Sequence, residues 1–209
     1  MTLILVDIQN DFMPGGALAV PHGDQIVPIV NKMVKYAFSA DKMVVATKDW
    51  HPAGHGSFAS THGAEVMTMG KLDGLDQVMW PDHCIQETNG SEFHPDLEDV
   101  DLFSAVIFKG LDPKVDSYSG FFDNAKRNST GLHDFLKERE AHDLYICGLA
   151  RDYCVGFTCL DAAELGYNVT LIYDATKAVN YPEGNDESMI KKLLEKGVNI
   201  ISSKEFIGE

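Results

Sequence analysis

The chain has 209 residues, of which 44% are hydrophobic and 23% charged, a composition that indicates a folded globular protein and excludes a largely disordered one. Its 17 Lys and Arg against 32 Asp and Glu give a formal net charge of −15. This charge opposes binding to nucleic-acid backbones and to anionic membrane surfaces, so we expect neither partner and favour a small neutral or cationic ligand. The length predicts a single domain over residues 1–209.

Short runs rich in Val, Ile and Leu recur along the chain without strict alternation, which is typical of strands buried on both faces of a parallel sheet. In chain order they are Leu3–Val6, Met43–Ala46, Ala105–Phe108, Leu144–Cys147, Val169–Tyr173 and Val198–Ile201. Helical periodicity predicts helices over Asp24–Ala40, Ser129–Glu140 with Ser129 as N-cap, Val155–Leu165 and Ser188–Lys196. The alternation predicts an α/β fold with a doubly wound, mainly parallel sheet and helices on both faces. Residues 48–103 show little periodicity, which predicts a long functional loop.

The cysteines and the N-terminal segment indicate the compartment. The four cysteines form no C-x-x-C motif, so no zinc ribbon is expected. Disulfide frameworks are typical of shorter, cysteine-dense secreted chains, so none is expected here either. The first Lys or Arg is Lys32, and the apolar run at the N-terminus is only about four residues long before the carboxylate of Asp7, so we expect no signal peptide. No apolar run reaches the length of a membrane-spanning helix. A reducing cytoplasm is therefore the expected location.

Chemically reactive residues follow several of the predicted strands. Because ligands of open α/β sheets bind beyond the carboxyl ends of the strands, Asp7, Lys109 and Cys154 are expected to meet at one rim. Cys154 would stand at a helix start, where free N–H groups and the helix dipole favour a thiolate and can hold an oxyanion. We interpret the set as acid, ammonium and nucleophile. The alternatives are a small buried cysteine, a structural aspartate and a solvent-directed lysine.

The sequence also contains a candidate metal site. Asp49 and His51 have the i, i+2 spacing that puts two side chains on one side of an extended segment, and His83 is a third candidate ligand from the long loop. Two histidines and one carboxylate suit one divalent metal ion, with zinc ahead of iron or manganese. His55 and His62 are alternative ligands of lower rank. A solvated polar loop is the other reading of this segment.

Aromatic residues flank these positions and are candidates for the walls of a slot that holds a flat ring. They are Phe12, Trp50, Trp80, Tyr118 and Tyr153. Core packing is the alternative role for any of them. No G-x-G-x-x-G or Walker motif follows a strand, so we predict no phosphate-binding loop.

Seven segments in a fixed order carry a family resemblance. They are Val6–Phe12, Lys48–Pro52, His55–Phe58, Trp80–Cys84, Phe108–Gly110, Asp116–Phe122 and Asp152–Val155. In these segments the chain resembles the bacterial nicotinamidases, also called pyrazinamidases, of the isochorismatase-like cysteine hydrolases. The Asp-x-His segment and the Trp-Pro-x-His-Cys segment point to nicotinamidases in particular.

The resemblance implies a role for each matched residue. Cys154 would be the nucleophile, Asp7 the general base and Lys109 the residue that tunes and orients them. Asp49, His51 and His83 would bind a divalent metal that holds the pyridine nitrogen of the substrate or a water. The N–H groups of Ala150 and Cys154 would bind the oxyanion, with a cis peptide at Leu149–Ala150. The ring would be bound by Phe12, Trp80 and Tyr118, with Tyr153 beside them.

The implied function is hydrolysis of nicotinamide to nicotinate and ammonia in NAD salvage, with pyrazinamide as a further substrate. The alternatives are an amidohydrolase of the superfamily that acts on another small amide, such as a carbamoyl substrate, and a catalytically silent module that binds a metal or a ligand. Arg151 departs from the family, in which threonine is usual. We expect it to leave the activity in place and to change the geometry of the nucleophile loop or the acidity of Cys154. The sequence leaves open whether copies of the chain form a homo-oligomer.

Overall fold

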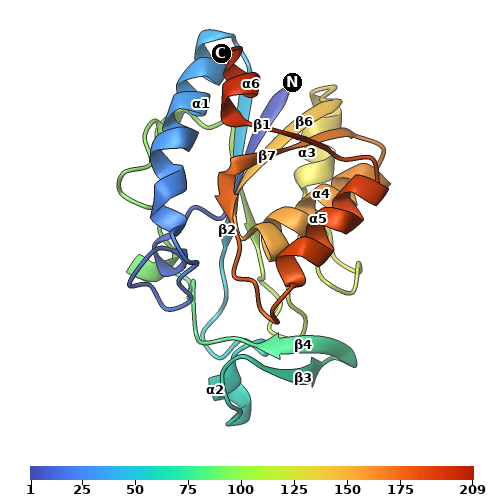
Figure 1. The fold of residues 1–209 in the computed structure, drawn as a ribbon. Coiled ribbons are helices and arrows are strands. Elements are labelled where there is room, and N and C mark those ends of the chain that lie inside the picture. Colours follow the sequence, from blue (N-terminus) through green and yellow to red (C-terminus); the bar gives the residue numbers. More distant parts are fainter.

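A six-stranded sheet lies between two layers of helices in the computed structural model, which describes residues 1–209 (Figure 1). The strand order is β5-β2-β1-β6-β7-β8, and every neighbouring pair is parallel. The strands are β1 Thr2–Val6, β2 Met43–Asp49, β5 Ala105–Lys109, β6 Asp143–Leu149, β7 Asn168–Lys177 and β8 Asn199–Ile201. All six strands predicted from the apolar runs are confirmed, as is the doubly wound parallel sheet.

Helices cover both faces of this sheet, as predicted (Figure 1). On one face lie α1 (Val27–Ser39) and α6 (Ser203–Ile207), and on the other α3 (Leu132–Glu138), α4 (Gly156–Glu164) and α5 (Asn185–Glu195). Each layer buries its own apolar cluster against the sheet. Four short 3₁₀ turns complete these layers and loops: Asn10–Phe12, Gly23–Ile26, Asn89–Ser91 and Val100–Leu102. None of the helices has the length and apolar character needed to cross a bilayer.

The topology creates a crevice between β1 and β6. From β1 the strand order runs outward through β2 to β5, and from β6 it runs the other way through β7 to β8. Such a reversal is where ligands bind in open α/β sheets. The two strands approach closely here, because a Cβ added to Gly148 (φ +116°) would lie 2.0 Å from the carbonyl oxygen of Val6. Asp7 and the turn with Cys154 leave the sheet on either side of this crevice.

The helix boundaries differ from those predicted. The segment predicted as a helix from Asp24 begins as the 3₁₀ turn Gly23–Ile26, and the α-helix starts only at Val27. Ser129 is not a helix N-cap: Gly131 occupies that position with φ +92°, and the Ser129 hydroxyl accepts the Gly131 N–H. The sequence suggested Ser129 because serine is a common N-cap, whereas the left-handed backbone at position 131 favours glycine.

The helix that carries Cys154 starts four residues earlier than predicted. Residues Arg151–Val155 form a π-helical turn that leads directly into α4. Gly166 follows the segment in a left-handed conformation (φ 89°), which is typical of the residue after a helix end. Cys154 therefore lies inside the first turn of a longer helical segment.

The prediction of an irregular loop over residues 48–103 is wrong in part. The segment contains the antiparallel hairpin β3 (Thr68–Leu72) and β4 (Leu75–Met79), and the short helix α2 (Ala59–His62). Asp73 and Gly74 both have positive φ, 48° and 82°, as a two-residue type I′ hairpin turn requires. The Asp-Gly pair was thus the sequence signal for the hairpin. Figure 1 shows the hairpin and α2 beyond the carboxyl ends of the sheet strands.

Candidate active site

Asp7, Lys109 and Cys154 converge at the crevice from three different elements. Asp7 follows β1 in a left-handed conformation (φ 49°), Lys109 ends β5, and Cys154 lies in the π-helical turn after β6. Lys109 Nζ is 2.8 Å from Asp7 Oδ2 and 3.3 Å from Cys154 Sγ. The three side chains that the sequence placed at one rim are therefore in contact through the ammonium group.

The Lys109 ammonium has further partners that hold it in place. It donates to Asp49 Oδ1 at 2.6 Å and to the Ser117 carbonyl at 3.0 Å, and the whole side chain is buried. Although burial alone would lower the pKa of Lys109, the carboxylates of Asp49 and Asp7 raise it well above its ordinary value. Lys109 is thus a fixed cation, and the sequence alternative of a solvent-directed lysine is excluded.

Thr47 is a contributor to which the sequence analysis gave no role. Its hydroxyl donates to Asp7 Oδ1 at 2.6 Å, and both residues are fully buried. The other oxygen, Asp7 Oδ2, accepts no hydrogen bond of good geometry and lies 2.8 Å from the Lys109 ammonium nitrogen. Burial raises the pKa of Asp7, while Lys109 and the Thr47 hydroxyl oppose the shift. Asp7 is therefore an oriented carboxylate with one oxygen free to accept a proton.

The turn around Cys154 departs from α-helical hydrogen bonding. The Ala150 carbonyl accepts the N–H groups of Tyr153 and Val155, and not that of Cys154, which an α-helix would use. The peptide between Leu149 and Ala150 is cis, as the resemblance implied. The backbone of the turn thus directs the Cys154 N–H away from the bonding pattern of an ordinary helix.

The expected preference of Cys154 for the thiolate is reversed. Burial raises the pKa of the Cys154 thiol well above its ordinary value, and the carboxylates of Asp7 and Asp49 add to this effect although Lys109 opposes it. The sequence argument included neither the burial of the thiol nor the two carboxylates. Cys84, Cys147 and Cys159 are fully buried.

Asp49, His51 and His83 form a compact cluster next to these residues. One ligand-type atom from each lies within 4.8 Å of the other two. His51 Nε2 is 3.5 Å from Asp49 Oδ1, and His83 Nε2 is 3.6 Å from Asp49 Oδ2. His51 Nε2 is buried without a hydrogen-bond partner. A buried ring nitrogen without a partner is unfavourable unless it meets a proton donor or a cation, so this donor set fits a metal ion.

The opposite ring nitrogens fix how the two imidazoles are oriented. His51 Nδ1 lies 3.0 Å from the Gly110 carbonyl, and His83 Nδ1 lies 2.8 Å from the Pro81 carbonyl. Because a carbonyl only accepts, each Nδ1 carries the proton and each Nε2 presents a lone pair toward Asp49. A Cβ at Gly110 would lie 2.4 Å from the His51 ring, so glycine is needed for this approach.

The alternative ligands that the sequence offered are engaged elsewhere. His55 Nδ1 is 2.8 Å from Ser57 Oγ and its Nε2 is 2.8 Å from the Asp112 carbonyl. His62 Nε2 is 2.8 Å from the Gly56 carbonyl. His55 does lie close to His51 and Asp116. Because both of its ring nitrogens are already bonded, His55 offers no free lone pair in this arrangement.

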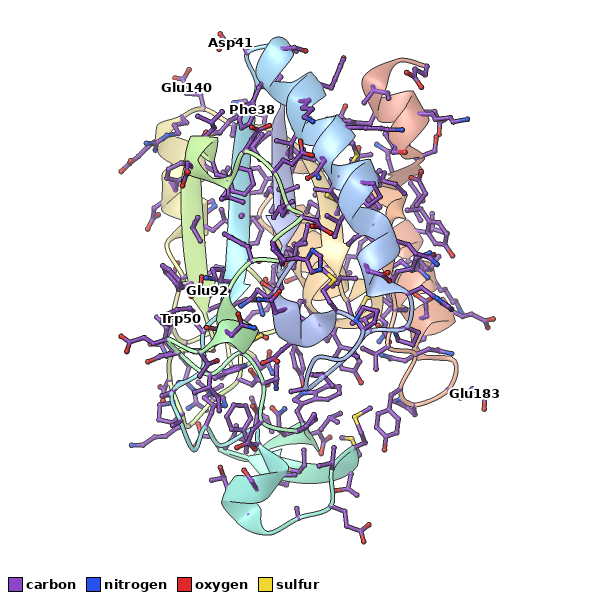
Figure 2. All side chains as sticks on the ribbon, turned by 90° about the vertical axis from the view of Figure 1, so that its left-hand side faces the viewer. Phe38, Asp41, Trp50, Glu92, Glu140 and Glu183 are labelled. Carbon is purple, nitrogen blue, oxygen red and sulfur yellow. The ribbon has the colours of Figure 1, made fainter.

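A pocket opens between the nucleophile and the metal-ligand cluster. It is lined by Phe12, Leu18, Asp49, Trp80, His83, Asp116, Tyr118, Ala150, Tyr153, Cys154 and Val179. The lining includes four of the five aromatic residues that the sequence offered as walls of a ring slot, and Leu18 and Val179 are additions that no sequence motif indicated. Trp50 does not line it: this ring packs at 5.1 Å on Phe108 and under the Lys48 ammonium, on the outer side near Glu92 (Figure 2).

The aromatic wall is ordered by mutual contacts. The Trp80 and Tyr153 rings meet edge to face at 4.9 Å, and the Tyr118 and Tyr153 rings at 5.3 Å. Trp80 Nε1 donates to the Tyr118 hydroxyl at 3.2 Å. Rings that hold one another in this way form a rigid apolar slot, which suits a flat ligand.

Comparison with known proteins assigns the family. The isochorismatase domain model matches residues 1–205. The chain belongs to the isochorismatase family. A nicotinamidase of Escherichia coli (strain K12) is 53% identical over 178 residues, covering 85% of this chain and 83% of the relative.

Solved structures of the isochorismatase family agree with this assignment. The nicotinamidase/pyrazinamidase of Acinetobacter baumannii superposes with a TM-score of 0.92 at 40% identity, covering 98% of this chain and 96% of that one. A pyrazinamidase of Pyrococcus horikoshii, solved in complex with zinc, superposes with a TM-score of 0.79 at 37% identity, covering 96% and 98%. The family resemblance drawn from the seven segments is thereby confirmed.

Proposed function

We propose that this member of the isochorismatase family is a nicotinamidase, which hydrolyses nicotinamide to nicotinate and ammonia and also accepts pyrazinamide. The observation that carries the proposal is the position of Cys154 Sγ, 3.3 Å from Lys109 Nζ and on the wall of a pocket that also exposes Asp49 and His83. The curated relatives with this name, at 53% and 41% identity over most of the chain, support it.

Asp7 is the proposed general base. One ligand-type atom each of Asp7 and Cys154 lies within 4.8 Å of the other. Because burial raises the pKa of Asp7, its carboxylate is more basic than usual and suited to take the thiol proton. The sulfur then forms a bond to the carboxamide carbon, and the Lys109 ammonium stabilises the developing thiolate at 3.3 Å.

The carboxamide oxygen becomes an oxyanion during this attack. The N–H groups of Ala150 and Cys154, at the start of the π-helical turn, are the proposed donors to it. Asp7 then returns the proton to the leaving nitrogen as the C–N bond breaks, which releases ammonia and leaves a thioester on Cys154. Asp7 next accepts a proton from a water that attacks the thioester, and nicotinate leaves as the thiol re-forms.

Asp49, His51 and His83 are the residues that would hold a divalent metal. Bound there, a metal offers open coordination positions to a water or to the pyridine nitrogen of the substrate. Phe12 and Trp80 line the same pocket and would pack on the ring.

Ammonia release from nicotinamide, pyrazinamide and an N-carbamoyl amino acid tests the proposal. We expect the two aromatic amides to be hydrolysed and the carbamoyl compound to be left intact, with no release by Cys154→Ala. Preference for the carbamoyl compound would establish another amidohydrolase. Absence of release from every amide by metal-loaded protein would instead favour a silent binding module.

A further inference from the structure

Arg151 begins the turn that carries Cys154, but its side chain contacts a different part of the fold. The guanidinium binds Asp186 in a bidentate manner, Nε to Oδ1 at 2.8 Å and Nη2 to Oδ2 at 2.6 Å. Nη1 donates to Thr176 Oγ1 at 3.2 Å, and the group lies 4.2 Å over the Tyr173 ring. Arg151 thus connects the first residue of the turn to the end of β7 and the first turn of α5.

Only 8% of Arg151 is exposed, which makes this pairing more than a surface ion pair. Exposed ion pairs contribute little, whereas a bidentate, largely buried arginine–carboxylate pair fixes the geometry of both partners. Removing one partner of such a pair leaves the other charge buried and unpaired. The relative position of the turn and α5 is therefore coupled to the Arg151–Asp186 pair.

Asp152, the residue after Arg151, binds the segment between Thr176 and Asp186 to the same turn. Asp152 accepts the N–H groups of Val179 and Asn180 at 2.9 and 2.8 Å, and the Asn185 side-chain amide at 3.2 Å. Val179 lines the substrate pocket. The segment from Thr176 to Asp186 is thus held at its middle by Asp152 and at both ends by Arg151.

Helix α5 packs tightly against the turn that carries Cys154. A Cβ added to Gly156 would lie 2.6 Å from Met189 Cγ of α5 and 2.7 Å from the Arg151 carbonyl oxygen. A shift of α5 therefore moves the backbone of the turn, and Cys154 lies two residues before Gly156. A displacement of the nucleophile by about 1 Å can slow an enzyme by about a hundredfold.

We propose that the Arg151–Asp186 ion pair is a positioning device for the reaction: it holds the π-helical turn and the Val179 wall so that Cys154 faces the pocket. Arg151 does not line the pocket and acts through the backbone of the turn. The role in turnover rests on the proposed amidase function, but the placement of Cys154 can be measured without any substrate.

The test compares Arg151→Met, Asp186→Asn and the double variant with wild type, in two assays at a temperature where circular dichroism shows each protein folded. In the amidase assay we expect kcat to fall by about tenfold in each single variant, and by no more than that in the double, since the two residues act as one unit. In the second assay, iodoacetamide should modify Cys154 at least about threefold faster, because a loosened turn exposes the thiol.

Arg139→Met is the matched control. Arg139 also packs on an aromatic ring, 3.8 Å from Phe135, and pairs with a carboxylate, Glu138, but none of these contacts involves the turn. It should leave both rates within twofold of wild type.

Two results would overturn the proposal: unchanged kcat and alkylation in folded Arg151→Met and Asp186→Asn, or independent, additive losses in the double variant. If Arg151→Met does not fold, Arg151→Lys is the variant to test, because lysine keeps the charge but cannot form the bidentate pair. Wild-type rates of Arg151→Lys in both assays would then refute the proposal. A wild type without amidase activity would refute the proposed function, while the alkylation assay would still judge the positioning role.

Discussion

The Lys109 ammonium lies 2.6 Å from Asp49 Oδ1, so one buried ion pair joins the nucleophile's partners to the metal-ligand cluster. Asp49 is therefore both a candidate ligand and a counter-ion. Truncating Asp49 should destabilise the chain even when no metal is present.

We expect chelator-treated Asp49→Ala to lose about 3 kcal/mol of unfolding free energy, because the buried Lys109 charge loses one of its two carboxylates. His83→Ala has no such charge to leave behind and should lose less than about 1 kcal/mol relative to wild type under the same conditions. Denaturant unfolding of the three metal-free proteins measures this. Equal losses in the two variants would show that the ion pair adds nothing to stability.

Cys154→Ala should abolish ammonia release without unfolding the domain, because Cys154 is the only cysteine that lines the pocket. Cys159→Ala, in the core of α4, should retain most of the activity. Because burial raises the pKa of the Cys154 thiol, its alkylation should be slow at neutral pH and accelerate through the alkaline range. Mass spectrometry of partly alkylated protein identifies the modified cysteine, and modification of Cys84 before Cys154 would contradict this assignment.

Asp7→Asn should lower kcat by roughly 10²–10⁴-fold, because the amide keeps the shape of the carboxylate but cannot take the thiol proton. Lys109→Met should be equally severe, since it leaves two buried carboxylates without their cation. Steady-state kinetics with thermal melts as the folding control checks both variants. A near-normal rate in either folded variant would mean that the catalytic roles are misassigned.

Thr47→Val should shift the acid limb of the pH profile to higher pH. The Thr47 hydroxyl donates to the ionised form of Asp7 and so lowers the pKa of that carboxyl. Without the donor this pKa rises, the carboxylate is protonated at a higher pH, and activity below that pH is lost. The pH dependence of kcat/KM measures the midpoint, and Thr47→Ser, which keeps the hydroxyl, should restore it. An unchanged midpoint in Thr47→Val would remove Thr47 from the mechanism.

Nicotinamide should be a much better substrate than benzamide, which has the same shape without the ring nitrogen. If the nitrogen interacts with the metal held by Asp49, His51 and His83, most of the preference should vanish after chelation and return when metal is restored. Elemental analysis should find about one metal per chain in wild type, and little in His83→Ala. His55→Ala is the control and should keep its metal; loss of metal there, with retention in His83→Ala, would transfer the ligand role to His55.

The sequence by itself determined the strand layout and the rim residues. Parallel strands buried on both faces must be apolar throughout, so β1 and β6 could be read as continuous runs, and the polar residue after each run had to lie at the carboxyl edge. Asp7, Lys109 and Cys154 were found in this way. The Asp73–Gly74 turn was also readable, although the loop assignment overlooked it.

Only the tertiary structure decided which partner each polar group has. Thr47 and Asp7 are 40 residues apart, and Arg151 and Asp186 are 35 apart, and no local pattern distinguishes these residues from others of their type. The pKa of the Cys154 thiol also depends on the tertiary structure. Burial and the carboxylates of Asp7 and Asp49 raise it and outweigh the local effect of a helix start. Periodicity reports which face of an element is buried, whereas hydrogen bonds and desolvation depend on what the fold brings against that face.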